Sequence, residues 1–207
     1  MNRTFLIILM IGTAMMIAVI GQHEPASRLD TMPWEVDKLD NGSLRVFGLT
    51  LGKTSIQEAN QIFARFGKTQ FQVETADNGL QSYQLVTIFD ELSFGGLLAK
   101  LKLSHQIEAS KLQAIYKSLN SPPTKPGVEF YPVDKTIELD YLNSPISSIT
   151  YIPSVDYDLE SIRQNFGQAP SENKINNELQ LWNYPQMGLK IHIHSTEPDQ
   201  FFYAPLQ

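Results

Sequence analysis

Residues 158–170 read DLESIRQNFGQAP and carry the pattern on which we base the expected fold. Asp158 can cap a helix, and Gly167 can end it because glycine tolerates the left-handed backbone that closes many helices. Ile162 and Phe166 are one turn apart, so both lie on the same side of that helix. The stretch predicts a short amphipathic helix that packs one face on another element.

Strands are expected after this helix. Residues 188–194 alternate apolar and polar side chains, which is typical of a strand with one buried and one solvent-facing side. Residues 179–184 and 201–203 are also rich in β-forming and aromatic side chains. The pattern predicts a unit in which a helix is followed by antiparallel strands.

A similar unit comes earlier in the chain. Ser55 and Glu58 fit a capping box that starts a helix over 54–66. The pairs Phe66-Gly67 and Phe166-Gly167 lie 100 residues apart, and in both the glycine is the expected helix stop. Further elements are expected as strands at 44–51, 70–74, 82–89, 97–103, 128–132, 136–142 and 148–152, and as a helix at 108–119.

These patterns predict an α+β fold of two related helix-on-antiparallel-sheet repeats after an N-terminal transmembrane or signal helix. Tandem duplication is favoured because each unit alone would bury too little surface, and the alternative is a chance likeness between two capped helices. The expected domains are a membrane anchor or signal peptide at 1–21, a tether at 22–42, a first repeat at 43–127 and a second repeat at 128–207.

The start of the chain reads MNRTFLIILMIGTAMMIAVIG, with Arg3 as the one charge before an uncharged run from Phe5 to Gly21. This run exceeds a typical cleaved signal core, so we favour an uncleaved inner-membrane anchor with the body in the periplasm. The alternative is a signal peptide cleaved near Gly21, which would release a periplasmic or secreted protein. Either way the body is expected to be exported.

Composition excludes several classes of function. The chain of 207 residues has a formal net charge of −6, and an acidic balance argues against nucleic acid as a partner. It contains no cysteine, which excludes disulfides, thiolate metal sites and cysteine nucleophiles.

Two short segments carry a family resemblance. Residues 51–59 read LGKTSIQEA, and residues 159–170 read LESIRQNFGQAP before Trp182-Asn183-Tyr184. These motifs resemble SmpA/BamE-like envelope modules, which also occur doubled in β-lactamase-inhibitor-type proteins. The resemblance implies helices on an antiparallel sheet and work through protein contacts, without catalytic residues. The chain departs from that family because it has no lipidated cysteine, and because its first copy lacks the proline and the W-x-Y strand.

A second resemblance rests on Met32-Pro33-Trp34 and on residues 46–52, which read VFGLTLG. These phrases are similar to an uncharacterised proteobacterial envelope family. That likeness implies an envelope location and no known activity.

No signature of an enzyme or a nucleotide site is complete. Residues 48–54 resemble a phosphate-binding loop, but three residues separate Gly48 from Gly52 where the loop needs four. We therefore expect no enzyme, no cofactor and no nucleotide.

Three other candidate sites have simpler explanations. A calcium loop starting at 156–160 is better explained as capping of the following helix by Asp156 or Asp158. Paired acid and base carboxylates at Glu138 and Asp140 are better explained as a solvent-facing strand, and a hydrolytic pair of His105 and Glu108 as a turn into a helix.

His192 and His194 are weak candidates for a metal site. They are two residues apart in an expected strand, so both imidazoles project from the same face. Glu197 and Asp199 could complete such a site, but the spacing matches no strong metal signature. A solvent-facing strand explains the pair more simply.

Aromatic residues are the remaining candidates for a binding surface, because tyrosine and tryptophan are enriched at binding hot spots. Core packing is the alternative for each of them. The sequence thus predicts a non-catalytic, membrane-tethered periplasmic module that binds another envelope or membrane protein, or alternatively a small ligand or metal in the cleft between repeats. The interface candidates are Trp182, Tyr184, Phe201, Phe202 and Tyr203.

Overall fold

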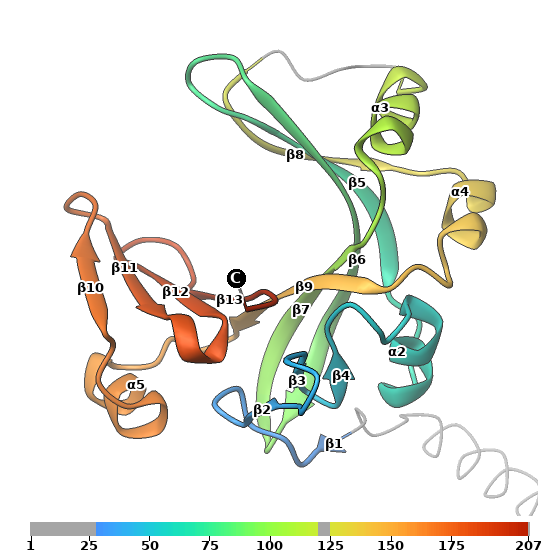
Figure 1. Ribbon diagram of the computed structural model, residues 1–207. Helices are drawn as coiled ribbons and strands as arrows, with labels where there is room; N and C mark the ends of the chain where they lie inside the picture. The colour runs from blue at the N-terminus through green and yellow to red at the C-terminus, as the bar shows by residue number, and fades with distance from the viewer. Residues whose placement is uncertain (1–27, 120–124, 207) are drawn as a thin grey trace, which may run out of the picture.

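The computed structural model describes residues 28–119 and 125–206 (Figure 1). The expected anchor at 1–21 lies outside these ranges, so its role stays a prediction. Within the two described ranges, no helix is long and apolar enough to cross a membrane.

A ten-stranded sheet organises the molecule and confirms an α+β fold dominated by antiparallel strands. Its order is β10-β11-β12-β13-β9-β7-β6-β5-β8, and the short β1 joins β6 in parallel. The strands are β1 (Arg28–Leu29), β5 (Lys68–Thr75), β6 (Gln81–Phe94), β7 (Leu97–His105), β8 (Gly127–Pro132), β9 (Ile146–Pro153), β10 (Ser171–Lys174), β11 (Leu179–Tyr184), β12 (Leu189–His194) and β13 (Gln200–Tyr203).

A small sheet and the helices pack against the large one. The small sheet consists of β2 (Val36–Lys38), β3 (Leu44–Val46) and β4 (Leu49–Thr50). The helices are α2 (Ile56–Ile62), α3 (Ala109–Lys117), α4 (Lys135–Asp140) and α5 (Leu159–Phe166), with a 3-10 turn, η1 (Pro185–Met187), between β11 and β12.

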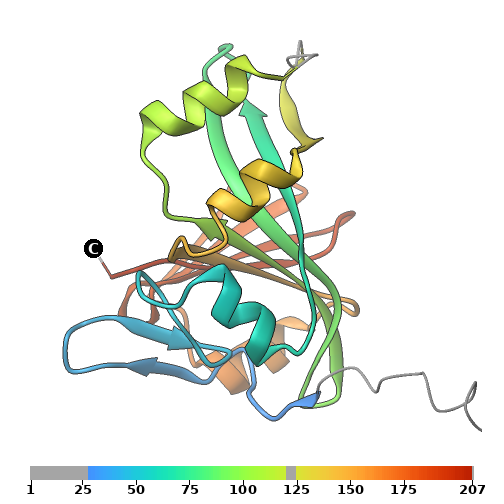
Figure 2. The same cartoon turned by 90° about the vertical axis from the view of Figure 1, so that its right-hand side faces the viewer.

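The large sheet is strongly curved, and its helices lie on the outer side of the curve. Figure 2 shows α2, α3 and α4 in front of the sheet, and Figure 1 shows α5 beneath β10, β11 and β12. Their apolar residues, such as Ala59 in α2, Ile115 in α3 and Ile162 in α5, join buried clusters with strand residues. None of these four helices lies on the inner side of the curve.

Two apolar clusters lie on the helix side of the sheet. The larger one runs from α2 and the small sheet to α5 and includes Phe47, Tyr151 and Trp182. The smaller one consists of Phe71, Val73, Leu85 and Ile115, with side chains of α3 and α4 around it.

A buried polar belt separates the two clusters. Thr87 Oγ1 lies 2.9 Å from Thr69 Oγ1 and 2.8 Å from His105 Nε2. His105 Nδ1 in turn lies 2.8 Å from Ser144 Oγ. Thr69, Thr87 and His105 lie on the helix side of β5, β6 and β7, and the belt is closed by the loop that precedes β9.

Helix α2 begins as predicted and ends about one turn early. Ser55 Oγ accepts the Glu58 N–H at 3.2 Å, and the Glu58 carboxylate accepts the Ser55 N–H at 2.7 Å, so the capping box is confirmed. Ala64 takes a φ of +49°, which ends the helix before the expected stop at Gly67. Phe66 is 88% exposed, so its predicted place in the buried stripe is wrong. Helix α5, in contrast, ends as predicted at Gly167, where φ is +80°.

Two other predicted elements are wrong in type. Residues 136–142 form most of α4 instead of a strand: Ile137 and Tyr141, four residues apart, pack on the smaller cluster, while Leu139 between them faces solvent. A short run that alternates apolar and polar residues fits either period, and the packing decides. Residues 44–51 form the β3–β4 hairpin instead of one strand, because Phe47 and Gly48 both take positive φ at its turn.

The described part of the expected tether is packed on the body. Trp34 meets the rings of Tyr157 and Phe166 edge-on, with centroids 6.5 and 6.0 Å away. Tyr203 donates its hydroxyl hydrogen to the carbonyl of Pro33 at 2.6 Å. Residues 28–42 therefore form part of the folded domain.

Candidate functional site

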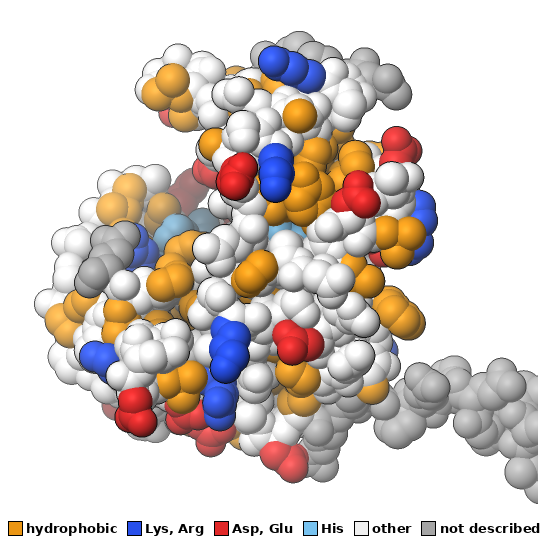
Figure 3. Space-filling model, turned by 45° about the vertical axis from the view of Figure 1, so that its right-hand side comes forward, with side chains coloured by type: hydrophobic (Ala, Val, Ile, Leu, Met, Phe, Trp, Pro, Cys, Tyr) orange, Lys and Arg blue, Asp and Glu red, His pale blue; other side chains and the backbone are white. Residues whose placement is uncertain are grey.

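One side of the large sheet is covered by none of the described helices (Figure 1). Side chains alternate between the two sides of a strand, so residues between core positions project to this open side. Figure 3 shows a hollow between the upper and the left-hand parts of the molecule, with histidine side chains at the surface inside it. This open side is the candidate binding surface.

We call this surface the inner face and define it by a row of residues that crosses eight strands. The pairing registers place each residue of the row directly opposite the next. Three of its members are lysines, and none is acidic. The row is Lys68, Ile88, Lys102, Thr150, Phe202, Lys190, Asn183 and Ser171.

The curvature buries the middle of the inner face although none of the described helices covers it. Thr150 is only 4% exposed, and Ser104 and Val86 on neighbouring strands are also buried. Residues there are screened by their own neighbours on a concave surface. The centre of the inner face is therefore partly desolvated before any partner arrives.

Lys102 lies in this desolvated centre. Its Nζ donates a hydrogen bond to Gln72 Oε1 at 3.0 Å. Burial lowers the pKa of Lys102, and the charge of Glu74 only partly offsets that effect. Among the described residues no carboxylate lies within 4.0 Å of its ammonium group, whereas the neighbouring Lys100 pairs with Asp90 at 3.2 Å. Lys102 is thus a half-buried cation that, among the described residues, makes no ion pair and feels only the more distant charge of Glu74.

His192 and His194 both project to the inner face from β12, as predicted. Their ring centroids are 6.4 Å apart, and burial lowers the pKa of His192, with the charges of His194 and Lys190 adding to the effect. His194 Nε2 is buried without a hydrogen-bond partner among the described residues.

The carboxylate expected to help the histidines bind a metal is used elsewhere. Asp199 Oδ1 accepts the backbone N–H of His194 at 2.9 Å. Burial raises the pKa of Asp199. In the described part of the chain, no cluster of three or more histidine or acidic side chains is arranged to hold a metal ion.

Four of the five predicted interface aromatics belong to the core instead. Trp182, Tyr184, Phe201 and Tyr203 are fully buried on the helix side, because β11 and β13 present these positions to α5 and the small sheet. Phe202 alone of the five lies on the inner face, where it is half-buried.

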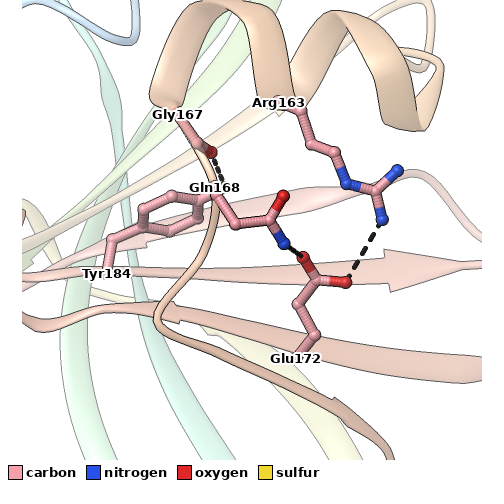
Figure 4. A network of polar contacts seen from close by, with 5 residues as sticks. All are labelled: Arg163, Gly167, Gln168, Glu172 and Tyr184. Carbon is pink, nitrogen blue, oxygen red and sulfur yellow. Dashed lines mark hydrogen bonds and ion pairs between the residues drawn. The ribbon is translucent and has the colours of Figure 1, made fainter.

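A polar network closes the helix side over these aromatics (Figure 4). The Arg163 guanidinium pairs with Glu172 at 3.2 Å. It also lies 4.7 Å from the Trp182 ring centroid. Tyr184 donates its hydroxyl hydrogen to the Gly167 carbonyl at 3.0 Å. These contacts fasten α5 to β10 and β11, which makes them structural.

His105 is not placed for catalysis. Both ring nitrogens are engaged by Thr87 and Ser144, and burial lowers its pKa to about 4, with a backbone contact to Tyr141 acting in the opposite direction. Glu108, its expected partner, is the residue that precedes α3. In the described part of the chain, neither a hydrogen bond nor an ion pair joins the His105 ring to the Glu108 carboxylate.

The acidic residues considered as candidates from the sequence cap a helix or lie in a helix instead of a strand. Asp158 caps α5 by accepting the Ser161 N–H at 2.8 Å. Glu138 and Asp140 lie in helix α4, so their expected position on a strand is wrong, and Glu138 pairs with Lys135 at 3.0 Å.

Sequence reasoning missed Lys102 as a functional candidate. The alternation of apolar residues with Lys100 and Lys102 in 97–103 predicts a strand with one buried and one solvent-facing side; the strand is confirmed and Lys100 is exposed, but Lys102 is half-buried. The half-burial of Lys102 comes from the curvature of a sheet whose strands are far apart in sequence. No local pattern carries that information.

Comparison with known proteins adds no relative to this picture. No family model, no curated protein and no solved structure matches the chain. The likeness to SmpA/BamE-type modules therefore stays a prediction made from short motifs.

Proposed function

We propose that the protein is a non-catalytic, membrane-tethered interaction module of the bacterial envelope that binds another envelope or membrane protein through its inner face. The observation that carries the proposal is Lys102, a half-buried cation at the centre of the open surface that makes no ion pair with a described residue. The location rests on the apolar leader at 1–21.

The sheet order supports a tandem architecture. Helix α2 is followed by β5, β6 and β7, and α5 is followed by β10, β11 and β12. In the sheet, β9 is the fourth strand of the first set and β13 is the fourth strand of the second. These two strands pair with each other in the middle of the sheet. We propose that the halves are related repeats joined at β9 and β13, with α3, β8 and α4 inserted into the first.

The helices would correspond at an offset of 103 residues instead of 100. That offset matches the N-cap Ser55 with the N-cap Asp158, and the buried Ala59 and Phe63 with Ile162 and Phe166. The first repeat would also end after β9 instead of at residue 127, because β8 and β9 both pair with strands of the first half: β8 with β5, and β9 with β7.

The partner that fits the inner face presents a carboxylate. Lys102 has already lost part of its hydration, so binding of a carboxylate costs little further desolvation of the lysine and gives it an ion-pair partner. Lys68 and Lys190 in the same row add attraction for an acidic surface, although the whole chain is acidic. We therefore assign an acidic protein surface as the partner.

Lys102→Met tests the proposal because methionine keeps the apolar stem and removes the charge. Full-length protein in detergent-solubilised envelope membranes is treated with a carbodiimide, which couples a lysine amine directly to a partner carboxylate. We expect a cross-linked peptide that contains Lys102, and at least a ten-fold weaker capture of that partner by Lys102→Met, in keeping with the loss of one member of a desolvated charge pair.

Lys174→Met is the matched control, since Lys174 is an exposed residue of β10 opposite Gln180, on the helix side. It should leave capture unchanged. Cross-links confined to residues outside the inner face, or equal capture by both variants, would reject the inner face as the docking surface.

Binding of a small ligand or metal is the second candidate, and the unpartnered Nε2 of His194 favours it. Beside His192, a hollow of about 310 Å³ lies across β7, β9 and β13, between Lys100, Ile152 and Gln200. Titration calorimetry with Zn²⁺ and Cu²⁺ would support the metal form if a stoichiometric heat disappears in His192→Ala/His194→Ala. The absence of any heat in the wild type would exclude it.

A further inference from the structure

Exposed apolar side chains gather at one end of the large sheet. Leu97 and Leu98 follow the β6–β7 turn and are 42% and 49% exposed, and Val155 in the loop after β9 is 80% exposed. Together with Pro153 and Tyr157 they surround an open hollow of about 400 Å³. We call Leu97, Leu98 and Val155 the apolar tip.

The described chain enters at the same end. Arg28 in β1 is paired with Ser93 in β6, and Ser93 is paired with Leu98 in β7. The Ser154 N–H donates to the Leu98 carbonyl at 2.9 Å. Chain entry and apolar tip are therefore separated by two strand spacings, about 10 Å.

Only a short segment lies between this entry and the apolar leader. Residues 22–27 span at most about 20 Å when fully extended. If the leader crosses the membrane, this end of the sheet cannot move far from the lipid headgroups.

We propose that the apolar tip is a membrane-contact surface, which inserts Leu97, Leu98 and Val155 into the interface of a bilayer with zwitterionic headgroups. The inference rests on the membrane anchoring in the proposed function. Because the leader keeps the tip close to the bilayer, insertion of the apolar side chains costs little additional translational and rotational entropy.

The charges around the tip specify the kind of lipid. Residues 92–99 carry no charge. Two carboxylates that follow Val155 accept hydrogen bonds from the protein: Asp156 accepts the Asp199 N–H at 3.0 Å, and Asp158 caps α5. These acidic groups would still be repelled by anionic lipids, so the tip fits a zwitterionic surface.

The contact would orient the inner face. Strand β6 is 14 residues long, so about 45 Å of strand, measured along its curve, leads from the apolar tip to its far end. With the tip at the bilayer, the strands rise from the membrane, and the inner face opens sideways toward neighbouring membrane-bound proteins.

Absence of native cysteine allows a direct test with single nitroxide labels on the full-length chain. Leu98→Cys and Val155→Cys report the tip, and Leu80→Cys, 70% exposed next to the far end of β6, is the matched control. Ala14→Cys reports the leader. Each labelled protein is reconstituted in phosphatidylcholine vesicles, and its accessibility to oxygen and to a water-soluble nickel chelate is measured.

We expect the ratio of oxygen to chelate accessibility at Leu98→Cys and Val155→Cys to be several-fold higher than at Leu80→Cys. If the ratios are equal at the three sites while Ala14→Cys is embedded in lipid, the proposed membrane contact of the tip is wrong and the proposed anchor stands. An aqueous label at Ala14→Cys would overturn both the anchor and the tip. Deeper tip labels after an anionic lipid is added would contradict the zwitterionic assignment.

Discussion

His105 sits in the polar belt that divides the core, with a neutral ring held between Thr87 and Ser144. In the folded state burial lowers its pKa from 6.5 to about 4. The unfolded chain therefore binds a proton at His105 as pH falls below about 6.5, whereas the folded chain does not until about pH 4. Stability contributed by the neutral ring is complete above this window and is lost as pH falls through it.

We predict that the wild type loses about 3 kcal/mol of unfolding free energy across this window because of His105. His105→Gln removes the titrating group and should flatten that part of the profile. Urea unfolding at a series of pH values between 7 and 4 measures the difference. Burial also lowers the pKa of His192, so the profile of His192→Ala is measured as well, in order to separate the contribution of His192 from that of His105. A profile for His105→Gln parallel to that of the wild type would contradict the role of His105.

At the level of single residues, the sequence indicated which side chains alternate along strands and missed how deeply they are buried. Trp182 and Tyr184 lie in a predicted strand at 179–184, yet the sequence left open whether they face a partner or the core. That choice depends on α5, which packs over them through contacts such as Arg163 on Trp182. Packing of α5 on the sheet therefore decides that Trp182 and Tyr184 face the core.

Among the elements, those with strong end signals were predicted best. The α5 stop at Gly167 and the α2 start at Ser55 are backbone requirements that a few adjacent residues express. Helix α4 was missed because six residues are too few to separate a helical from a strand period. The side it presents is set by the smaller apolar cluster, which comes from distant strands.

The capping box of α2 gives a prediction at the scale of the element. Ser55→Ala removes the oxygen that accepts the Glu58 N–H and should lower the unfolding free energy by about 1 kcal/mol. Chemical denaturation at neutral pH measures it, with Ser195→Ala, an exposed serine in a turn, as the control that should change little. Equal stability of Ser55→Ala and the wild type would mean that α2 is held by its buried face alone.

Across the whole molecule, sheet order is the feature that the sequence could not supply. Strands β9 and β13 are about fifty residues apart, and their pairing joins the two halves into one surface. The alternation within each strand indicates a buried side but not which strands become neighbours. The concave inner face, and with it Lys102, exists only at this scale.

The divided core predicts two stability levels. The larger cluster runs through both halves of the sheet, so it should unfold as one unit, whereas the smaller cluster of four buried residues lies beyond the polar belt. Local opening that exposes only the smaller cluster costs less free energy than global unfolding. The arm formed by α3, β8 and the outer ends of β5 and β6 is therefore expected to open first.

Hydrogen exchange with two matched truncations tests this division. Ile115→Ala removes apolar volume from the smaller cluster and should speed exchange in α3 and β8 while the amides of β11 and β12 keep their rates. Ile162→Ala acts on the larger cluster and should speed exchange of the slowest amides in both β7 and β12. If Ile115→Ala instead raised exchange in β12 as much as in α3, the belt at Thr87 and His105 would not separate two units. The far arm of the inner face would then be as rigid as its centre, because one cooperative core would support both.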